Sequence, residues 1–376
     1  MSILIGADIV PTKANEEFFI SGNMLPILGA ELLDLLNNSD YRIFNLECPL
    51  VNTGSPIQKR GPNLRAETST VKGLKSIGVD LLTLANNHIM DHGKAGLEST
   101  ISVLKKECIS FLGAGENLKA AALPFVFFAN KKKIGVYVCA EHEFSIAGKN
   151  KPGANPFDPL ESFDFVDDLK NSCDYVIVLY HGGKEHYRYP SPILQRVCRK
   201  FVEKGANLVV CQHSHCIGCE EKYNEGTIVY GQGNFIFDSH CNPMSDSSLL
   251  IKINDDFKIE YIPLEKNGCG VCLAKDDSAR KILSDFQQRS GQIKKDGFIE
   301  NEYSNFAKNM VNSYLLACSG YGHKFLLRLL NKVCGHKLSA FFSSRFKKSE
   351  LLAIRNFIEC EAHRELFISG LKKSQE

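Results

Sequence analysis

The sequence predicts an α/β fold built on a parallel sheet, followed by a helical C-terminal part. An apolar run at 79–85 is too short for a helix and follows Gly78, which is typical of a buried strand. A helical pattern at 94–106 comes next, so strands and helices alternate as they do in parallel sheets. From about residue 274 helical periodicity dominates. We therefore expect two parts, residues 1–268 and 275–376.

The remaining elements follow from the same periodicities. Apolar runs of strand length predict strands at 3–9, 41–46, 174–180, 207–211, 227–230 and 235–237, and hairpins of 124–129 with 133–139 and of 249–253 with 257–264. Amphipathic spacing predicts helices at 31–37, 69–77, 160–171 and 192–204, and in the C-terminal part at 278–289, 303–317, 324–333 and 349–371.

Composition excludes several classes of protein. The 376 residues carry a net charge of +2, which gives no footprint for binding nucleic acid. No apolar run approaches membrane-spanning length. The N-terminus enters a strand with no basic region and long apolar segment before it, so we expect no signal peptide. The fourteen cysteines are expected to be free thiols in a reducing compartment, and the chain to be cytoplasmic.

Five predicted strands end in groups that can bind metals. These are Asp8, Glu47, Asn87-His88, His181 and His213-Ser214-His215. A lone histidine at a strand end is more often structural, but five strand ends that agree favour a shared site at the carboxyl edge of the sheet. Carboxylate and amide oxygens with imidazoles are the ligands that two adjacent divalent cations need.

The order of these motifs resembles the CapA family, the capsule and poly-γ-glutamate synthesis proteins. The motifs that carry the resemblance cover roughly residues 1–265 and are Gly6-Ala7-Asp8, Asn45-Leu46-Glu47-Cys48-Pro49-Leu50, Ala85-Asn86-Asn87-His88-Ile89-Met90-Asp91-His92-Gly93, His181-Gly182-Gly183-Lys184-Glu185, His213-Ser214-His215 and Tyr230-Gly231-Gln232-Gly233-Asn234-Phe235. The resemblance implies a four-layered sandwich like that of the calcineurin-like metallophosphoesterases, with a C-terminal helical subdomain.

The resemblance also implies a role for each motif residue. Asp8 would bind the first metal ion and Glu47 would bridge two ions. Asn87, His181 and His213 would bind the second ion, and His215 would return to the first. The ions would be Mn, Fe or Zn. Position 10, a histidine in most such phosphoesterases, is Val10 here, so one imidazole of the first site is missing.

Two functions are compatible with this resemblance. In the first, the chain is a metal-dependent hydrolase in capsule or poly-γ-glutamate synthesis, in which a metal-bound hydroxide attacks a phosphoester or related bond and His88 is the general acid. In the second, the chain binds metal and a polyanion without catalysis, as an assembly component of a polymer synthesis or export machinery that includes other capsule proteins.

Arg60, Glu185 and Asn234 are the residues that we expect to contact substrate. Arg60 lies on a cationic loop with Lys59 and Arg65, which would suit an anionic polymer or phosphoester. An ordinary solvated loop is the alternative.

Two further patterns have an ordinary explanation and a functional one. The pairs Cys216/Cys219 and Cys269/Cys272 have zinc-site spacing, but they are far apart and cysteines are common in this chain. Residues 303–349 hold eight Lys and Arg among apolar residues and no Asp or Glu. That composition suits an anionic membrane surface or an acidic partner, and a helical subdomain packed on the α/β part is the alternative.

Overall fold

The computed structural model describes residues 2–237, 242–320, 329–331, 333–335, 338, 341 and 344–374. The chain forms two compact units, Met1–Glu300 and Asn301–Glu376. The boundary expected at 268–275 lies inside the first unit, because strand β16 (Gly270–Leu273) occupies this stretch. The next helix, α8 (Asp276–Gln292), also belongs to the first unit, where Phe286 packs against Tyr261 with 4.9 Å between ring centroids.

The first sheet of this unit has eight strands. Its order is β16-β15-β14-β1-β2-β3-β4, and β13 pairs with the carboxyl-terminal half of β1. Strands β1 to β4 and β13 run parallel, whereas β14, β15 and β16 form an antiparallel extension. The bounds are β1 Ser2–Val10, β2 Tyr41–Leu46, β3 Leu81–Thr83, β4 Ser110–Leu112, β13 Asn234–Phe237, β14 Ser247–Asn254 and β15 Ile259–Asn267.

The second sheet has six strands in the order β11-β12-β10-β9-β7-β6. Its four central strands are parallel and the two edge strands are antiparallel. The bounds are β6 Phe125–Ala129, β7 Lys132–Ala140, β9 Tyr175–His181, β10 Leu208–Gln212, β11 Glu220–Tyr223 and β12 Gly226–Tyr230. A separate two-stranded ribbon pairs β5 (Ala114–Gly115) with β8 (Gly153–Ala154).

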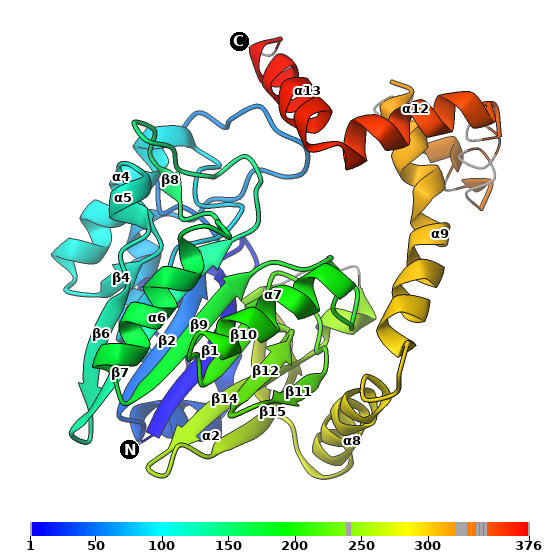
Figure 1. The fold of residues 1–376 in the computed structure, drawn as a ribbon. Helices are drawn as coiled ribbons and strands as arrows, with labels where there is room; N and C mark the ends of the chain where they lie inside the picture. The colour runs from blue at the N-terminus through cyan, green and yellow to red at the C-terminus, as the bar shows by residue number, and fades with distance from the viewer. Residues whose placement is uncertain are drawn as a thin grey trace. The chain divides into compact units, whose positions relative to one another are not determined.

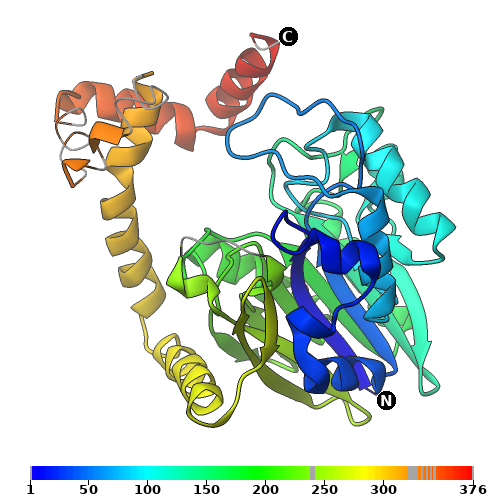
Figure 2. The same ribbon diagram turned by 180° about the vertical axis from the view of Figure 1, so that it is seen from behind.

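Three hydrophobic cores separate four layers, which confirms the predicted α/β sandwich. Side chains alternate between cores along each strand: Ile3 and Ile5 lie between the two sheets, whereas Leu4 faces the helices outside the first sheet. The outer layers are visible from opposite sides of the first unit (Figures 1 and 2). Helices α6 (Ser162–Ser172) and α7 (Pro192–Glu203) cover the second sheet. The first sheet is covered by α1 (Glu16–Ser21), α2 (Leu25–Asn37), α3 (Val71–Ser76) and α4 (Gly93–Lys106). Short helices η1 (Thr68–Thr70), α5 (Leu118–Ala121) and η2 (Pro243–Ser245) lie in connections.

Several elements differ from the sequence prediction. The helix expected at 31–37 is the second half of α2, whose pattern is interrupted by Gly29 at φ 72° and ψ 161°. The strand expected at 79–85 is regular only over Leu81–Thr83, because Leu84 to His88 leave the sheet. Helix α1 and the edge strands β11 and β16 were not predicted, since they are short and lack a complete apolar face.

The second unit is helical as predicted. Helix α9 (Phe298–Cys318) leads into it, and α12 (Lys348–Glu359) and α13 (Glu361–Lys373) end it. The single helix predicted at 349–371 is wrong: Cys360 adopts φ −71° and ψ 120°, which ends α12 before α13 begins. Most of the helix predicted at 324–333 lies outside the described residues. In the described part of the chain, we find no helix with both the length and the apolar content needed to cross a bilayer.

Candidate metal centre

The carboxyl ends of strands from both sheets meet at one place. In the first sheet Asp8 is in register with Asn45 on one side and Asn234 on the other. In the second sheet His181 is in register with Gln212, the last residue of β10. Glu47 and His213 directly follow β2 and β10, so the strands deliver these side chains to the same edge.

All six predicted metal ligands lie in one cluster. Ligand atoms of Glu47, His181 and His213 lie within 4.8 Å of one another, and so do those of Asp8, Glu47 and His215. The sixth residue, Asn87, places its Oδ1 3.0 Å from His181 Nε2. The convergence that the sequence predicted is therefore present, and the arrangement can be compared with what a cation requires.

The cluster contains more acceptors than donors. His181 Nε2 lies 3.0 Å from Asn87 Oδ1, 3.2 Å from Glu47 Oε1 and 3.1 Å from His213 Nδ1. One N–H can serve only one of these three atoms. Among the described residues, the buried side-chain oxygens without a hydrogen-bond partner include Asp8 Oδ2 and both carboxylate oxygens of Glu47. Buried carboxylates are normally paired or bound to metal, so this set of carboxylates, imidazoles and an amide oxygen fits divalent cations.

Burial shifts the pKa of several of these groups toward their neutral forms. It raises the pKa of Glu47 from 4.5 to about 8, with a further contribution from the Asp8 carboxylate. It lowers the pKa of His181 to about 4 and that of His213 well below its ordinary value. Burial also disfavours the charged form of His215, but the Glu47 and Asp8 carboxylates outweigh it and raise that pKa. Two neutral imidazoles are therefore available as ligands near neutral pH.

The His213-Ser214-His215 turn brings both rings to the cluster with a left-handed backbone at each histidine. His213 has φ +80° and His215 has φ +52°, a region that residues with a Cβ rarely adopt. The two ring centroids are 5.8 Å apart. Gly231, at φ +115°, packs against this turn, and a Cβ there would lie 2.6 Å from Ser214 Oγ. Such strain persists where the surrounding structure fixes it, often at functional sites.

His88, the predicted general acid, is held by two residues whose roles the sequence did not indicate. Its Nδ1 lies 2.6 Å from Asp91 Oδ2, and Lys59 Nζ lies 3.1 Å from the same nitrogen. Lys59 also forms an ion pair with Asp91, and the Lys59 side chain is only 3% exposed. Asp91 Oδ2 further accepts a hydrogen bond from Leu64 N at 2.6 Å. Asp91 therefore fixes the orientation of His88 and ties the loop 51–66 beside the metal cluster.

The three predicted substrate contacts occupy different positions. Glu185 is exposed, and one of its carboxylate oxygens lies within 4.8 Å of ligand atoms of His213 and His215. Asn234 is buried, and its Oδ1 lies 2.8 Å from His215 Nδ1, so this residue orients a predicted ligand. Arg60 is exposed on its loop, and its neighbour Lys59 is the cation that reaches His88.

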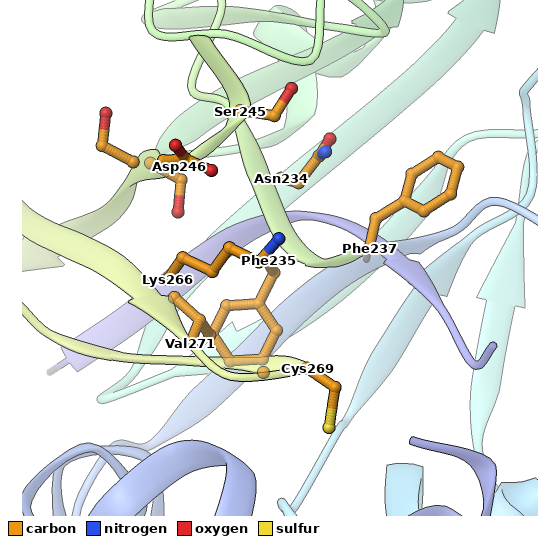
Figure 3. Close-up of a pocket in the computed structure, with 11 residues that line it drawn as sticks. Asn234, Phe235, Phe237, Ser245, Asp246, Lys266, Cys269 and Val271 are labelled. Atoms are coloured by element: carbon orange, nitrogen blue, oxygen red, sulfur yellow. The ribbon is translucent and has the colours of Figure 1, made fainter. Parts of the chain in front are cut away.

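A pocket adjoins Asn234 and is lined by residues of β13, β14, β15 and β16. Figure 3 shows Asn234 above Phe235, with Ser245 above Asn234, Asp246 to its left, and Lys266 and Cys269 below. Ser245 Oγ donates to the backbone oxygen of His215 at 2.9 Å, which links this pocket to the turn that carries the two histidines.

Two buried asparagines organise the strand ends. Asn45 Nδ2 donates to Asp8 Oδ1 at 2.7 Å, and Asn45 Oδ1 accepts from Thr83 Oγ1 and Asn86 Nδ2. Asn86 Nδ2 also donates to Leu46 O, and Asn86 Oδ1 accepts from His88 N at 3.1 Å. Asn45 and Asn86 belong to the motifs found in the sequence. The sequence alone does not show whether such an asparagine binds a metal or positions its neighbours.

The structure also shows the surroundings of Val10 and of the two cysteine pairs. Val10 is 2% exposed and packs in the core between the first sheet and its helices. Within the described chain, the clusters that could hold a metal contain no cysteine, which gives no support to a zinc site formed by the two Cys pairs. The described cysteines are all free thiols.

A known protein family matches the part of the chain that contains the cluster. The model of the family described as "Bacterial capsule synthesis protein PGA_cap" matches residues 8–239, which include the six residues of the cluster and His88. The chain belongs to this family. It is 32% identical over 243 residues to the capsule biosynthesis protein CapA of Bacillus anthracis, covering 61% of this chain and 59% of that protein. It is 29% identical over 253 residues to the PGA biosynthesis protein CapA of Bacillus subtilis, covering 65% and 66%. The chain thus spans about three fifths to two thirds of the length of these relatives.

Solved structures with a similar arrangement are distant in sequence. One is a novel phosphatase of Mycoplasma pneumoniae, with a TM-score of 0.43, 18% identity, and coverage of 71% of this chain and 94% of that one. Another is a 5'-nucleotidase precursor of Thermus thermophilus, with a TM-score of 0.41, 13% identity, and coverage of 77% and 58%. These values are too low to support an argument about activity.

Proposed function

We propose that this family member is a metal-dependent hydrolase of the phosphoesterase type that acts in the synthesis of capsule or poly-γ-glutamate. The observation that supports this proposal most strongly is the cluster of buried carboxylate oxygens on Asp8 and Glu47 without hydrogen bonds, which face the imidazoles of His181, His213 and His215. An interior of this kind is costly unless cations balance it.

In this proposal Asp8, Glu47, Asn87, His181, His213 and His215 hold two divalent cations, with Mn, Fe and Zn as the candidates. Cations bound there would acidify a water molecule and neutralise charge on a phosphoryl oxygen. The protein would supply orientation and a proton. Asp91 accepts from His88 Nδ1, which leaves Nε2 of that ring to donate to the leaving group. Lys59 balances the charge of Asp91 and holds the loop over the site.

The substrate would be an anionic polymer or a phosphoester intermediate of its synthesis. The names of the two Bacillus relatives support a link to capsule and to PGA. Glu185, which has a carboxylate oxygen within 4.8 Å of ligand atoms of His213 and His215, and exposed Arg60, which follows Lys59 in the chain, would contact such a substrate.

A second candidate is a metal- and polyanion-binding assembly component without catalysis. The buried Val10 favours it, because the first site then has one imidazole fewer than the phosphoesterases that the chain resembles.

One experiment separates the two candidates. Hydrolysis of an aryl phosphate is measured with added Mn²⁺ for the wild type and for His88→Ala. Metal-dependent turnover that the variant lacks supports the hydrolase. Binding of poly-γ-glutamate with no turnover of any aryl phosphate supports the assembly role.

A further inference from the structure

The positive charge of the chain is concentrated in its second unit. Residues 301–376 contain twelve Lys and Arg and six Glu, so this unit carries a charge of +6. The first 300 residues carry −4. The near-neutral total therefore conceals a basic C-terminal unit, which lies beyond residues 8–239, the part of the chain that the family model matches.

The last two helices of this unit expose apolar side chains. Neither α12 nor α13 has a buried residue. The exposed apolar residues define what we call the α12–α13 surface: Leu351, Leu352, Phe357, Ile358, Leu366, Phe367, Ile368 and Leu371, which are 39% to 74% exposed. The rings of Phe357 on α12 and His363 on α13 meet at 5.9 Å between centroids, so the apolar residues of the two helices adjoin.

The charges on these helices leave this surface with a basic border. Lys347 and Lys348 begin α12, and Lys372 and Lys373 end α13. The two glutamates of α12 are engaged locally: Glu350 accepts from Lys347 N at 2.7 Å, and Glu359 pairs with Arg355 at 2.7 Å. In α13 the helical period turns Leu366, Phe367 and Leu371 roughly 80° to 160° away from Glu361 and Glu365, whereas Ile368 lies on the same side as these glutamates.

We propose that the α12–α13 surface docks this protein on an anionic lipid bilayer. A lipid surface offers both kinds of contact that this composition favours: acyl chains for the exposed apolar side chains and anionic headgroups for a unit of charge +6. Helices of 12 and 13 residues are about 18 and 20 Å long, well short of the roughly 30 Å apolar thickness of a bilayer, so they lie in the interface.

Two other occupants of the α12–α13 surface, a second copy of the chain and a soluble polyanion, fit it less well. A second copy bound through the same surface would bring two +6 units together, which costs electrostatic energy. A soluble polyanion such as poly-γ-glutamate would satisfy the lysines but would leave Leu366 and Phe367 in water. Lipid is the occupant that satisfies both properties of the surface.

The test is co-sedimentation of the full chain with vesicles of phosphatidylcholine alone or with 30% phosphatidylglycerol. We expect binding that requires phosphatidylglycerol and weakens at least fivefold between 0.1 and 0.5 M NaCl. Leu366→Glu with Phe367→Glu should weaken binding at least tenfold, and Lys372→Gln with Lys373→Gln about threefold. The matched control is Leu160→Glu with Phe128→Glu, two residues of the first unit that are 82% and 71% exposed, which should bind like the wild type.

Three results would overturn the proposal. One is binding that is absent or equal on both kinds of vesicle. Another is a Leu366→Glu/Phe367→Glu variant that binds vesicles like the wild type. The third is a wild-type dimer in light scattering that this variant converts to a monomer with no lipid binding, which would assign the surface to a second copy. The variants lie outside the metal cluster, so aryl phosphate hydrolysis measured without vesicles tests the proposed function separately.

Discussion

Replacement of Glu47 by Gln tests the physical consequence of burying an unpaired carboxylate. The carboxylate is fully buried, and its pKa is raised from 4.5 to about 8. Because the pKa in the folded state exceeds that in the unfolded state, the folded protein holds the proton more tightly. Glu47 therefore contributes its full stability below pH 4.5, and this contribution is lost as the pH rises to 8.

The magnitude follows from the size of this shift. A shift from 4.5 to about 8 corresponds to about 5 kcal/mol in total, most of which is lost between pH 5 and pH 8. Glu47→Gln has no titrating group at this position. In urea unfolding with EDTA, the free energy of unfolding of the wild type should thus fall by several kcal/mol more than that of the variant between pH 5 and pH 8.

Divalent metal should reverse the sign of this pH dependence. A cation binds the deprotonated carboxylate, so Mn²⁺ should stabilise the wild type more as the pH rises, with affinity increasing up to tenfold per pH unit below 8. Glu47→Gln should lose most of this stabilisation. Glu141→Gln is the matched control, because Glu141 also has its pKa raised by burial but accepts a hydrogen bond from Gly183 N at 3.1 Å. That variant should keep the response to Mn²⁺.

Either of two outcomes would refute this reasoning. In one, the wild type and Glu47→Gln lose stability in parallel between pH 5 and pH 8 in EDTA. In the other, Mn²⁺ stabilises Glu47→Gln as much as it stabilises the wild type.

Three other predictions concern the surroundings of the cluster. Asp91→Asn should lower aryl phosphatase activity at least tenfold and stability by about 3 kcal/mol, because Lys59 loses its buried partner; activity and unfolding free energy equal to the wild type would contradict this. Gly231→Ala should cost about 2 kcal/mol in urea unfolding and weaken Mn²⁺ binding, whereas Gly291→Ala, with open space around its Cβ, should do neither. Chelation should lower the melting temperature, and Mn²⁺ at 100 times its Kd should restore about 2.7 kcal/mol; an unchanged melting curve would count against a bound metal.

The strand ends were predictable because their signal is local. An apolar run followed at once by Asp8, Glu47, His181 or His213 places a polar group at the end of a buried strand, and parallel strands align these ends. The layered arrangement was also predictable from a local signal. An apolar run such as Ile3, Leu4 and Ile5 places successive side chains on opposite faces of a strand, so both faces of the sheet must be covered.

The parts that sequence reasoning missed depend on chain segments that fold back. Lys59 reaches His88 only because the loop 51–66 returns across Asp91. The motif around Asn234 does not show that its register beside Asp8 brings its Oδ1 to His215, and the predicted substrate contact of Asn234 stays a prediction. The break at Cys360 has no proline or glycine to mark it, so periodicity alone predicted one helix where there are two.

Metal analysis of the full chain, purified without chelators, tests the central claim most directly. The buried Glu47, His181 and His213 cluster predicts at least one equivalent of Mn, Fe or Zn per chain in the wild type, and a several-fold lower content in His213→Ala. A wild-type chain with less than a tenth of an equivalent, and no heat of binding when any of the three ions is added, would contradict the assignment of this cluster as a metal centre.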